Sequence, residues 1–168
     1  ETAPATDYDG NAHTATGYTA TADYELFNIS NNVSLVEGNI AVASRTDAGT
    51  ANMGLTPAMF QNSDTNYDAT FVIAADGYQT VNPIDATVTI VGTTNTVDYD
   101  GAEHSVGGYT TSFSTPLYTD ADFTFSGAAE ATRTDAGETA MGLNAAQFAN
   151  ADSTNFTNVT FIVTDGGV

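Results

Sequence analysis

The sequence has no lysine and no cysteine, and besides two histidines its only basic residues are Arg45 and Arg133. Against 21 acidic residues this gives a formal net charge of −19 at pH 7. Nucleic acids and anionic membrane surfaces both require clustered cations, so neither is expected as a partner. The absence of lysine excludes Schiff-base and P-loop chemistry. The absence of cysteine excludes disulfides, thiol catalysis, zinc–thiolate sites and iron–sulfur clusters.

Long apolar runs are also missing. No stretch approaches the roughly 20 residues that a membrane-spanning helix needs, and the N-terminal residues lack a basic and then apolar signal pattern. Apolar residues nevertheless make up 41% of the chain, with 9 Phe and 8 Tyr. That content is enough to build a hydrophobic core, so we expect a folded chain without membrane insertion.

An internal repeat is the main feature of what is present. Two short motifs occur twice, about 90 residues apart, and a similar apolar run follows each second motif. The matched motifs are Tyr8-Asp9-Gly10…His13 with Tyr99-Asp100-Gly101…His104, and Arg45-Thr46-Asp47-Ala48-Gly49 with Arg133-Thr134-Asp135-Ala136-Gly137. The repeat predicts two tandem domains, residues 1–83 and 84–168, with the junction at the turn-favouring dipeptide Asn82-Pro83.

The two copies differ at their beginnings. Copy two opens with the β-branched run 86–92, whereas copy one has only residues 1–6 ahead of its first motif. We therefore expect the first strand of copy one to be truncated, as in a fragment of a longer array.

Period-two alternation of apolar residues predicts strands in both copies. Short Ala-rich stretches that follow a capping residue predict one helical turn between the last two strands of each copy, at 56–60 and 144–148. An all-β immunoglobulin-like sandwich is favoured over a β-grasp, because neither copy contains an amphipathic stretch of three helical turns. The expected strands are 13–23, 24–30, 33–44, 50–55 and 68–75 in copy one, and 86–92, 95–100, 104–114, 122–132, 138–143 and 157–164 in copy two.

On these two motifs, and over essentially its whole length, the chain resembles the YDG/MBG-type repeat domains of bacterial cell-surface proteins and adhesins. One small departure is Glu138, where the family commonly has threonine. The resemblance implies an extracellular stalk or adhesive repeat rather than an enzyme, and it supplies no ligand.

Each motif has a structural and a functional interpretation. Asp9 with His13, and Asp100 with His104, could form acid–base pairs, but no nucleophile or metal ligand lies nearby in the sequence. A turn in which Asp accepts backbone N–H groups and Tyr packs inward is favoured. Each arginine, in so negative a chain, is expected to pair with a carboxylate rather than to bind an anion or a sugar acid.

Calcium is the alternative ligand that the sequence leaves open. Several loops alternate oxygen-bearing side chains in the way that Ca²⁺ sites do, although ordinary Asx turns account for the same pattern and no complete EF-hand loop is present. The candidate metal ligands are Asp64, Asn66, Asp68, Asp120, Asp122, Asp152 and Asn155.

The function favoured by the sequence is a structural or adhesive tandem module, a stalk or spacer outside the cell, whose partners are the neighbouring repeats of the same chain. One alternative is a module that binds calcium, a glycan or a host protein, with tyrosines stacking on sugar faces. A second is a filament subunit whose missing strand is supplied by a neighbour. The tyrosines considered for sugar stacking are Tyr18, Tyr24, Tyr109 and Tyr118.

Overall fold

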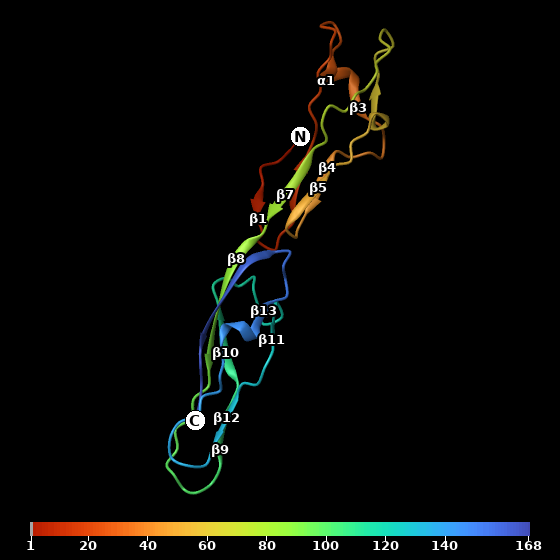
Figure 1. Ribbon diagram of the computed structural model, residues 1–168. Coiled ribbons are helices and arrows are strands. Elements are labelled where there is room, and N and C mark those ends of the chain that lie inside the picture. Colours follow the sequence, from red (N-terminus) through yellow and green to blue (C-terminus); the bar gives the residue numbers. More distant parts are fainter. Residues whose placement is uncertain (1) are drawn as a thin grey trace. The chain divides into compact units, whose positions relative to one another are not determined.

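The computed structural model describes residues 2–168, which divide into two compact units, Glu1–Pro83 (unit 1) and Ile84–Val168 (unit 2). Both units are built mostly of short strands (Figure 1), so the expected all-β class is confirmed. Within the described residues, no helix is long and apolar enough to cross a membrane.

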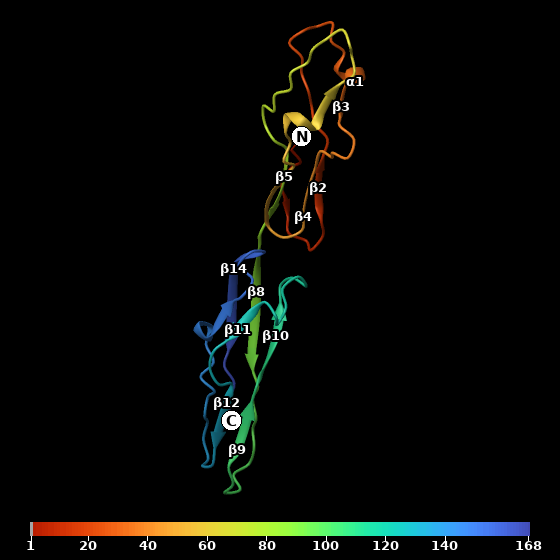
Figure 2. The ribbon, with the colours of Figure 1, turned by 90° about the vertical axis from the view of Figure 1, so that its right-hand side faces the viewer.

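Unit 2 is organised around one long central strand, β8. It pairs antiparallel with β10 on one side and parallel with β14 on the other (Figure 2). Two smaller antiparallel ladders, β11 with β13 and β9 with β12, complete the unit. The elements are β8 (Ile84–Gly92), β9 (His104–Gly107), β10 (Tyr109–Phe113), β11 (Phe123–Phe125), β12 (Glu130–Arg133), the 3-10 turn η2 (Ala145–Gln147), β13 (Phe148–Asn150) and β14 (Phe156–Thr164).

The core of unit 2 lies between these layers. Val88 and Ile90 of β8 are both 0% exposed, as the period-two pattern predicts for one face of a central strand. Phe161 of β14 contacts Phe123 of β11 and Phe148 of β13, each with ring centroids 5.8 Å apart. The β10–β8–β14 sheet therefore packs face to face on the β11–β13 pair, which is a sandwich-like arrangement.

Unit 1 has a smaller central strand, β7, which lies between β1 and β5 (Figure 1). β2 pairs with β4, and β3 pairs with β6. The elements are β1 (Thr6–Asp7), β2 (His13–Thr16), the short helix α1 (Ile29–Asn32), β3 (Val33–Leu35), β4 (Val42–Arg45), β5 (Gly49–Asn52), the 3-10 turn η1 (Pro57–Met59), β6 (Phe60–Asn62) and β7 (Tyr78–Asn82). One buried cluster of unit 1 is made of small side chains and one methionine: Ala15, Ala41, Ala43 and Met53.

Two ladders are the same in both units. β2–β4 corresponds to β9–β12, and β3–β6 corresponds to β11–β13, with equivalent residues opposite one another. The two expected helical turns are present as η1 and η2. η1 leads directly into β6, and η2 leads directly into β13. The repeat seen in the sequence is thus a repeat of strand pairing.

Some of the longer expected strands are interrupted where a strand changes partner. The predicted strand 104–114 divides at Gly108, whose φ is +87°, into β9 and β10. The predicted strand 122–132 divides near Gly127, whose φ is +147°, into β11 and β12. These φ values favour glycine, and the change in chain direction lets each half pair with a different neighbour. In unit 1 the predicted strands 13–23 and 33–44 are likewise shorter, because only β2, β3 and β4 form within them.

Other expected strands are wrong altogether. Residues 24–30 form no strand; the side chain of Asn28 accepts a hydrogen bond from Asn31 N at 3.2 Å and caps α1 instead. Residues 68–75 and 95–100 form no strand, and 138–143 contributes a single bridge, Ala140 with Gly167. These three segments have the alternation of strands, but the described chain places no neighbouring strand of sufficient length beside them.

The importance of the β8 face can be tested with Val88→Ala. Removing two methyl groups from a site with 0% exposure should lower the free energy of unfolding of unit 2 by about 1–3 kcal/mol. Val91→Ala, on the same strand but 43% exposed, is the matched control and should change it by under about 0.5 kcal/mol. Urea unfolding followed through the amide signals of unit 2 measures both values, and equal losses would contradict the assignment of the buried face.

Candidate functional site: the His–Arg corner of each unit

The two sequence motifs meet at one place in each unit. The β2–β4 register sets His13 directly opposite Arg45, and the β9–β12 register sets His104 opposite Arg133. We call each of these places the His–Arg corner: Asp9, His13, Arg45 and the 46–49 turn in unit 1, and Asp100, His104, Arg133 and the 134–137 turn in unit 2. Each corner holds one of the two arginines and one of the two histidines of the sequence.

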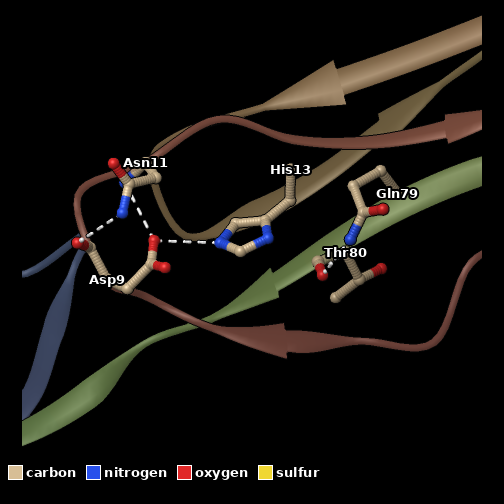
Figure 3. A network of polar contacts seen from close by, with 5 residues as sticks. All are labelled: Asp9, Asn11, His13, Gln79 and Thr80. Atoms are coloured by element: carbon tan, nitrogen blue, oxygen red, sulfur yellow. Dashed lines mark hydrogen bonds and ion pairs between the residues drawn. The ribbon is translucent and has the colours of Figure 1, made fainter.

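In unit 1 the Asp9 carboxylate closes the turn ahead of β2. Its Oδ1 accepts a hydrogen bond from Asn11 N at 2.8 Å and lies 2.9 Å from Nε2 of His13. Figure 3 shows the imidazole directed across the turn at this carboxylate. The backbone hydrogen bond from Asn11, followed by the contact with His13, lowers the pKa of Asp9 to about 2.

Unit 2 repeats this geometry. Oδ1 of Asp100 accepts a hydrogen bond from Ala102 N at 2.8 Å and lies 2.9 Å from Nε2 of His104. The backbone bond and the histidine again lower the pKa of the aspartate. The glycines of both motifs, Gly10 and Gly101, have φ of +79°, the left-handed conformation that the tight turn requires.

The tyrosines of the first motif differ between the units. Tyr8 is half-buried, whereas Tyr99 is 67% exposed. The expectation that this tyrosine packs inward therefore fails in unit 2.

The arginines are held by main-chain carbonyl groups. Nη2 of Arg45 donates to Ala48 O at 2.8 Å, and Nη2 of Arg133 donates to the equivalent Ala136 O at 3.0 Å. Arg133 also donates to Asp135 O at 2.6 Å and to Glu138 O at 3.1 Å. In unit 2 the groups that Arg133 bonds are carbonyl oxygens of its own turn and the hydroxyl of Thr139, whereas the sequence led us to expect a carboxylate.

Glycine is required where the guanidinium covers the turn. A Cβ on Gly49 would meet the guanidinium of Arg45, and a Cβ on Gly137 would meet that of Arg133. Both glycines also have positive φ, +130° and +140°. In the five-residue motif the arginine side chain therefore covers the turn that follows it, and the glycine leaves room for the planar guanidinium.

The aspartate decides the acid–base chemistry of the corner. A carboxylate with a lowered pKa is a weak base at neutral pH, and the Asp9 and Asp100 side chains are 50% and 57% exposed. No serine or threonine hydroxyl is hydrogen-bonded to either imidazole in the described chain. The geometry fits a clasp that joins the start of one strand to its cross-strand neighbour.

A second clasp recurs that sequence reasoning overlooked. In unit 1, Asp76 accepts hydrogen bonds from Gly54 N at 2.8 Å and from Leu55 N at 3.1 Å. In unit 2, Asp165 accepts the equivalent hydrogen bonds from Gly142 N and from Leu143 N, both at 2.9 Å. The bond from Leu55 is the largest factor that lowers the pKa of Asp76. The signal in the sequence was the pairing of each Met-Gly-Leu with a distant Asp-Gly.

The candidate calcium ligands are occupied by turn contacts in most cases. Oδ1 of Asp64 accepts from Asn66 N at 3.0 Å, and Oδ1 of Asp152 accepts from Asn155 N at 3.0 Å. Burial disfavours ionisation of Asp152, but hydrogen bonds from Asn155 and Thr154 outweigh it and lower its pKa.

The remaining candidates lie apart from a common centre. Oδ2 of Asp122 accepts from Thr119 N at 2.8 Å, Oδ1 of Asp120 accepts from the Thr111 hydroxyl at 2.9 Å, and Asp68 is exposed. Among residues 2–168 no three acidic or histidine side chains converge as a metal site would require. Calcium binding by these loops stays a prediction from the sequence.

The tyrosines considered for sugar stacking differ in accessibility. Tyr118 is 1% exposed, and its hydroxyl donates to Asp122 O at 2.8 Å and to Oδ1 of Asn150 at 3.0 Å. Burial, reinforced by the charges of Asp122 and Asp152, raises its pKa to about 12. Tyr118 is thus a core residue, Tyr18 and Tyr109 are half-buried, and Tyr24 is 56% exposed.

Comparison of the chain with protein-family models, with curated proteins and with solved structures found no match.

The turn at Asp9 makes a measurable prediction about pH. Asp9 should titrate with a pKa of about 2, so its contribution to stability is present above the unfolded-state value of 3.8 and is lost as the pH falls toward 2. His13→Ala should raise this pKa only part of the way to 3.8, because the larger bond from Asn11 N remains. Carboxyl-carbon NMR titration measures both values, with Asp100 as the internal control; an unshifted Asp9 would contradict the clasp.

The two arginines offer a matched pair of substitutions. Arg133→Lys should lower the free energy of unfolding of unit 2 by about 1–3 kcal/mol, because an ammonium group cannot replace a planar fork bonded to several carbonyl oxygens. Arg45→Lys should cost less in unit 1, because Nε of Arg45 is buried without a hydrogen-bond partner, whereas Nε of Arg133 donates to Asp135 O. Thermal and urea unfolding measure the difference, and a larger loss for Arg45→Lys would refute the assignment.

Proposed function

We propose that the chain is a structural tandem module of an extracellular bacterial surface protein, a stalk or spacer that holds an adhesive part away from the cell. The observation that supports this proposal is that the same structural contacts recur in both units. The Asp–His contact, the arginine-wrapped turn and the aspartate that receives two backbone N–H groups are found in both units. Each of these contacts holds a turn or joins neighbouring strands.

Repetition of this kind supports a role in the fold. Determinants of a module's fold must be present in every copy, whereas a ligand site has to be retained only where the ligand binds. The loops that differ most between the units are those ahead of β3 and β11, where unit 1 has α1 and unit 2 has the buried Tyr118. The parts that vary are therefore outside the recurring clasps.

The surface chemistry fits a spacer. A net charge of −19 keeps repeated modules apart and soluble. The chain offers a trypsin-like protease only Arg45 and Arg133, and both side chains are engaged with their own turns. Presentation on a bacterial surface rests on the resemblance of the two motifs to surface-protein repeats.

The proposal is tested by displaying the chain between a membrane anchor and a tip epitope on a bacterial surface. Fusions that carry no copy, one copy or two copies of residues 1–168 should raise the epitope above the membrane in equal steps, measured by fluorescence height imaging. The matched control carries the Val88→Asp substitution, which places a charge in the core of unit 2 and should make the epitope height broadly distributed. An epitope height independent of copy number would refute a spacer. Tight binding of the isolated chain to glycans or host cells would favour the ligand-binding alternative.

A further inference from the structure

Unit 2 contains an open position beside its C-terminal residues. A hollow of about 680 Å³ is lined there by Asn95, Val97, Tyr99, Gly137, Glu138 and Val168, among other residues. A ladder begins at this place, because Thr139 N donates to Val168 O and Val168 N donates to Thr139 O at 3.0 Å. Beyond it, residues 96–99 and 137–138 make no backbone–backbone hydrogen bond with any described residue. Val97 and Tyr99 are 43% and 67% exposed.

Unit 1 shows what belongs in this position. Counted from the shared motifs, residues 97–98 correspond to β1 and residues 137–140 to β5, and in unit 1 both strands pair with β7. Gln79 and Val81 of β7 are each 1% exposed. Val168 corresponds to Gln79, so the hollow of unit 2 is the place that the last three residues of β7 fill in unit 1.

Unit 1 has an open position of its own, at a different place. Residues 18–22 correspond to β10 and residues 68–75 to β14, yet neither segment is a strand. Among the described residues, no backbone–backbone hydrogen bond reaches either segment. Phe71 nevertheless contacts Phe60 with ring centroids 5.9 Å apart, much as Phe161 contacts Phe148 at 5.8 Å.

Unit 2 shows what is missing from unit 1. There β8 lies between β10 and β14 and supplies the buried side chains Val88 and Ile90. In unit 1 the described residues form no strand that pairs with either of the two corresponding segments. Residues 71–73 keep the inward and outward alternation of a strand, with Phe71 and Ile73 half-buried and Val72 81% exposed, and both segments lack the partner that would bond their backbones.

The two missing strands are halves of one segment. β7 ends at Asn82 and β8 begins at Ile84, so only Pro83 separates the strand that completes unit 1 from the strand that is central to unit 2. Proline has no N–H to donate, which suits the point where the chain leaves one ladder and enters the next.

We propose that both units are strand acceptors, each completed by half of a connecting strand of the Tyr78–Gly92 type supplied by an adjoining repeat of the same polypeptide. The β7-like half enters the hollow of unit 2 in continuation of Val168. The β8-like half enters unit 1 directly ahead of residue 2, parallel to residues 68–75 and antiparallel to residues 18–22. This proposal rests on the tandem-module function, because the strand comes from another repeat of the same polypeptide. It therefore commits to a tethered strand rather than to one from a separate chain.

The register of the incoming residues follows from the complete positions. A Thr-Val-Asn sequence after Val168, copied from residues 80–82, would set its valine between Gly137 and Val97, as Val81 lies between Gly49 and Thr6. Its asparagine would reach Asp98, as Nδ2 of Asn82 donates to Oδ1 of Asp7 at 3.2 Å. At the other end, residue 1 aligns with Gly92, so a copy of residues 84–91 fits directly before it without a linker.

Two extended forms of the whole chain test the proposal. The first adds Thr-Val-Asn-Pro after Val168. The second adds Ile-Asp-Ala-Thr-Val-Thr-Ile-Val before residue 1 and carries Glu1→Gly, because a Cβ on Gly92 would meet the backbone of Gly166. The matched controls have the same lengths but carry Asp at the position copied from Val81, or at those copied from Val88 and Ile90, since these three side chains are 0–1% exposed.

Amide hydrogen exchange provides the readout. The C-terminal extension should slow exchange at residues 97, 98 and 138 by about 100-fold or more, and the N-terminal extension should do the same within residues 18–22 and 68–75. Each effect should be confined to the unit extended, and the Asp-bearing controls should leave exchange as it is in residues 1–168.

Three outcomes would overturn the proposal. Unchanged exchange in both extended chains would show that neither position accepts a strand. Equal protection by the Asp-bearing controls would show that added length, not a fitted strand, is responsible. Protection by the same segments added as free peptides, without any effect when they are tethered, would place the donor in a separate chain, as in a filament. The exchange measurement does not depend on surface display, so the spacer function and strand acceptance can fail separately.

Discussion

Backbone pairing to a central strand is the constraint on which the rest of this structure depends. A strand's N–H and C=O groups need partners, and an alternating sequence cannot supply them alone. β8 satisfies both β10 and β14 in unit 2, and β7 satisfies β1 and β5 in unit 1. Where no equivalent central strand is described, the corresponding segments form no ladder. The two copies share their turn motifs and therefore differ in which ladders they complete.

The turns are held by a different set of contacts, and these hardly differ between the units. Asp9 and Asp100 each accept a backbone N–H and contact a histidine, and Arg45 and Arg133 each wrap the turn that follows them. Such contacts are local, spanning two to five residues, so they form regardless of whether a neighbouring strand is present. Such local clasps suit a tandem repeat, because each unit keeps its turns whichever ladders it forms.

The sequence was a good guide wherever the deciding interactions are local. The Tyr-Asp-Gly turns, the helical turns η1 and η2, and the buried face of β8 at Val88 and Ile90 follow from residue types and period-two alternation. The sequence was a poor guide where a distant segment decides whether a strand or a side-chain contact forms. Residues 68–75 and 95–100 have strand-like alternation without a strand, and Arg133 was expected to pair with a carboxylate although carbonyl oxygens of its own turn bond it.

By itself, the sequence determined the all-β class, the two copies and the chemistry excluded by the absence of lysine and cysteine, since these follow from composition and periodicity. Only the tertiary structure decided which alternating segments become strands, that His13 and Arg45 meet across a ladder, and that Tyr118 is a core residue. The physical reason is that a backbone hydrogen bond and a buried side chain both require a second segment at a particular register. That segment can lie tens of residues away, or in an adjoining repeat.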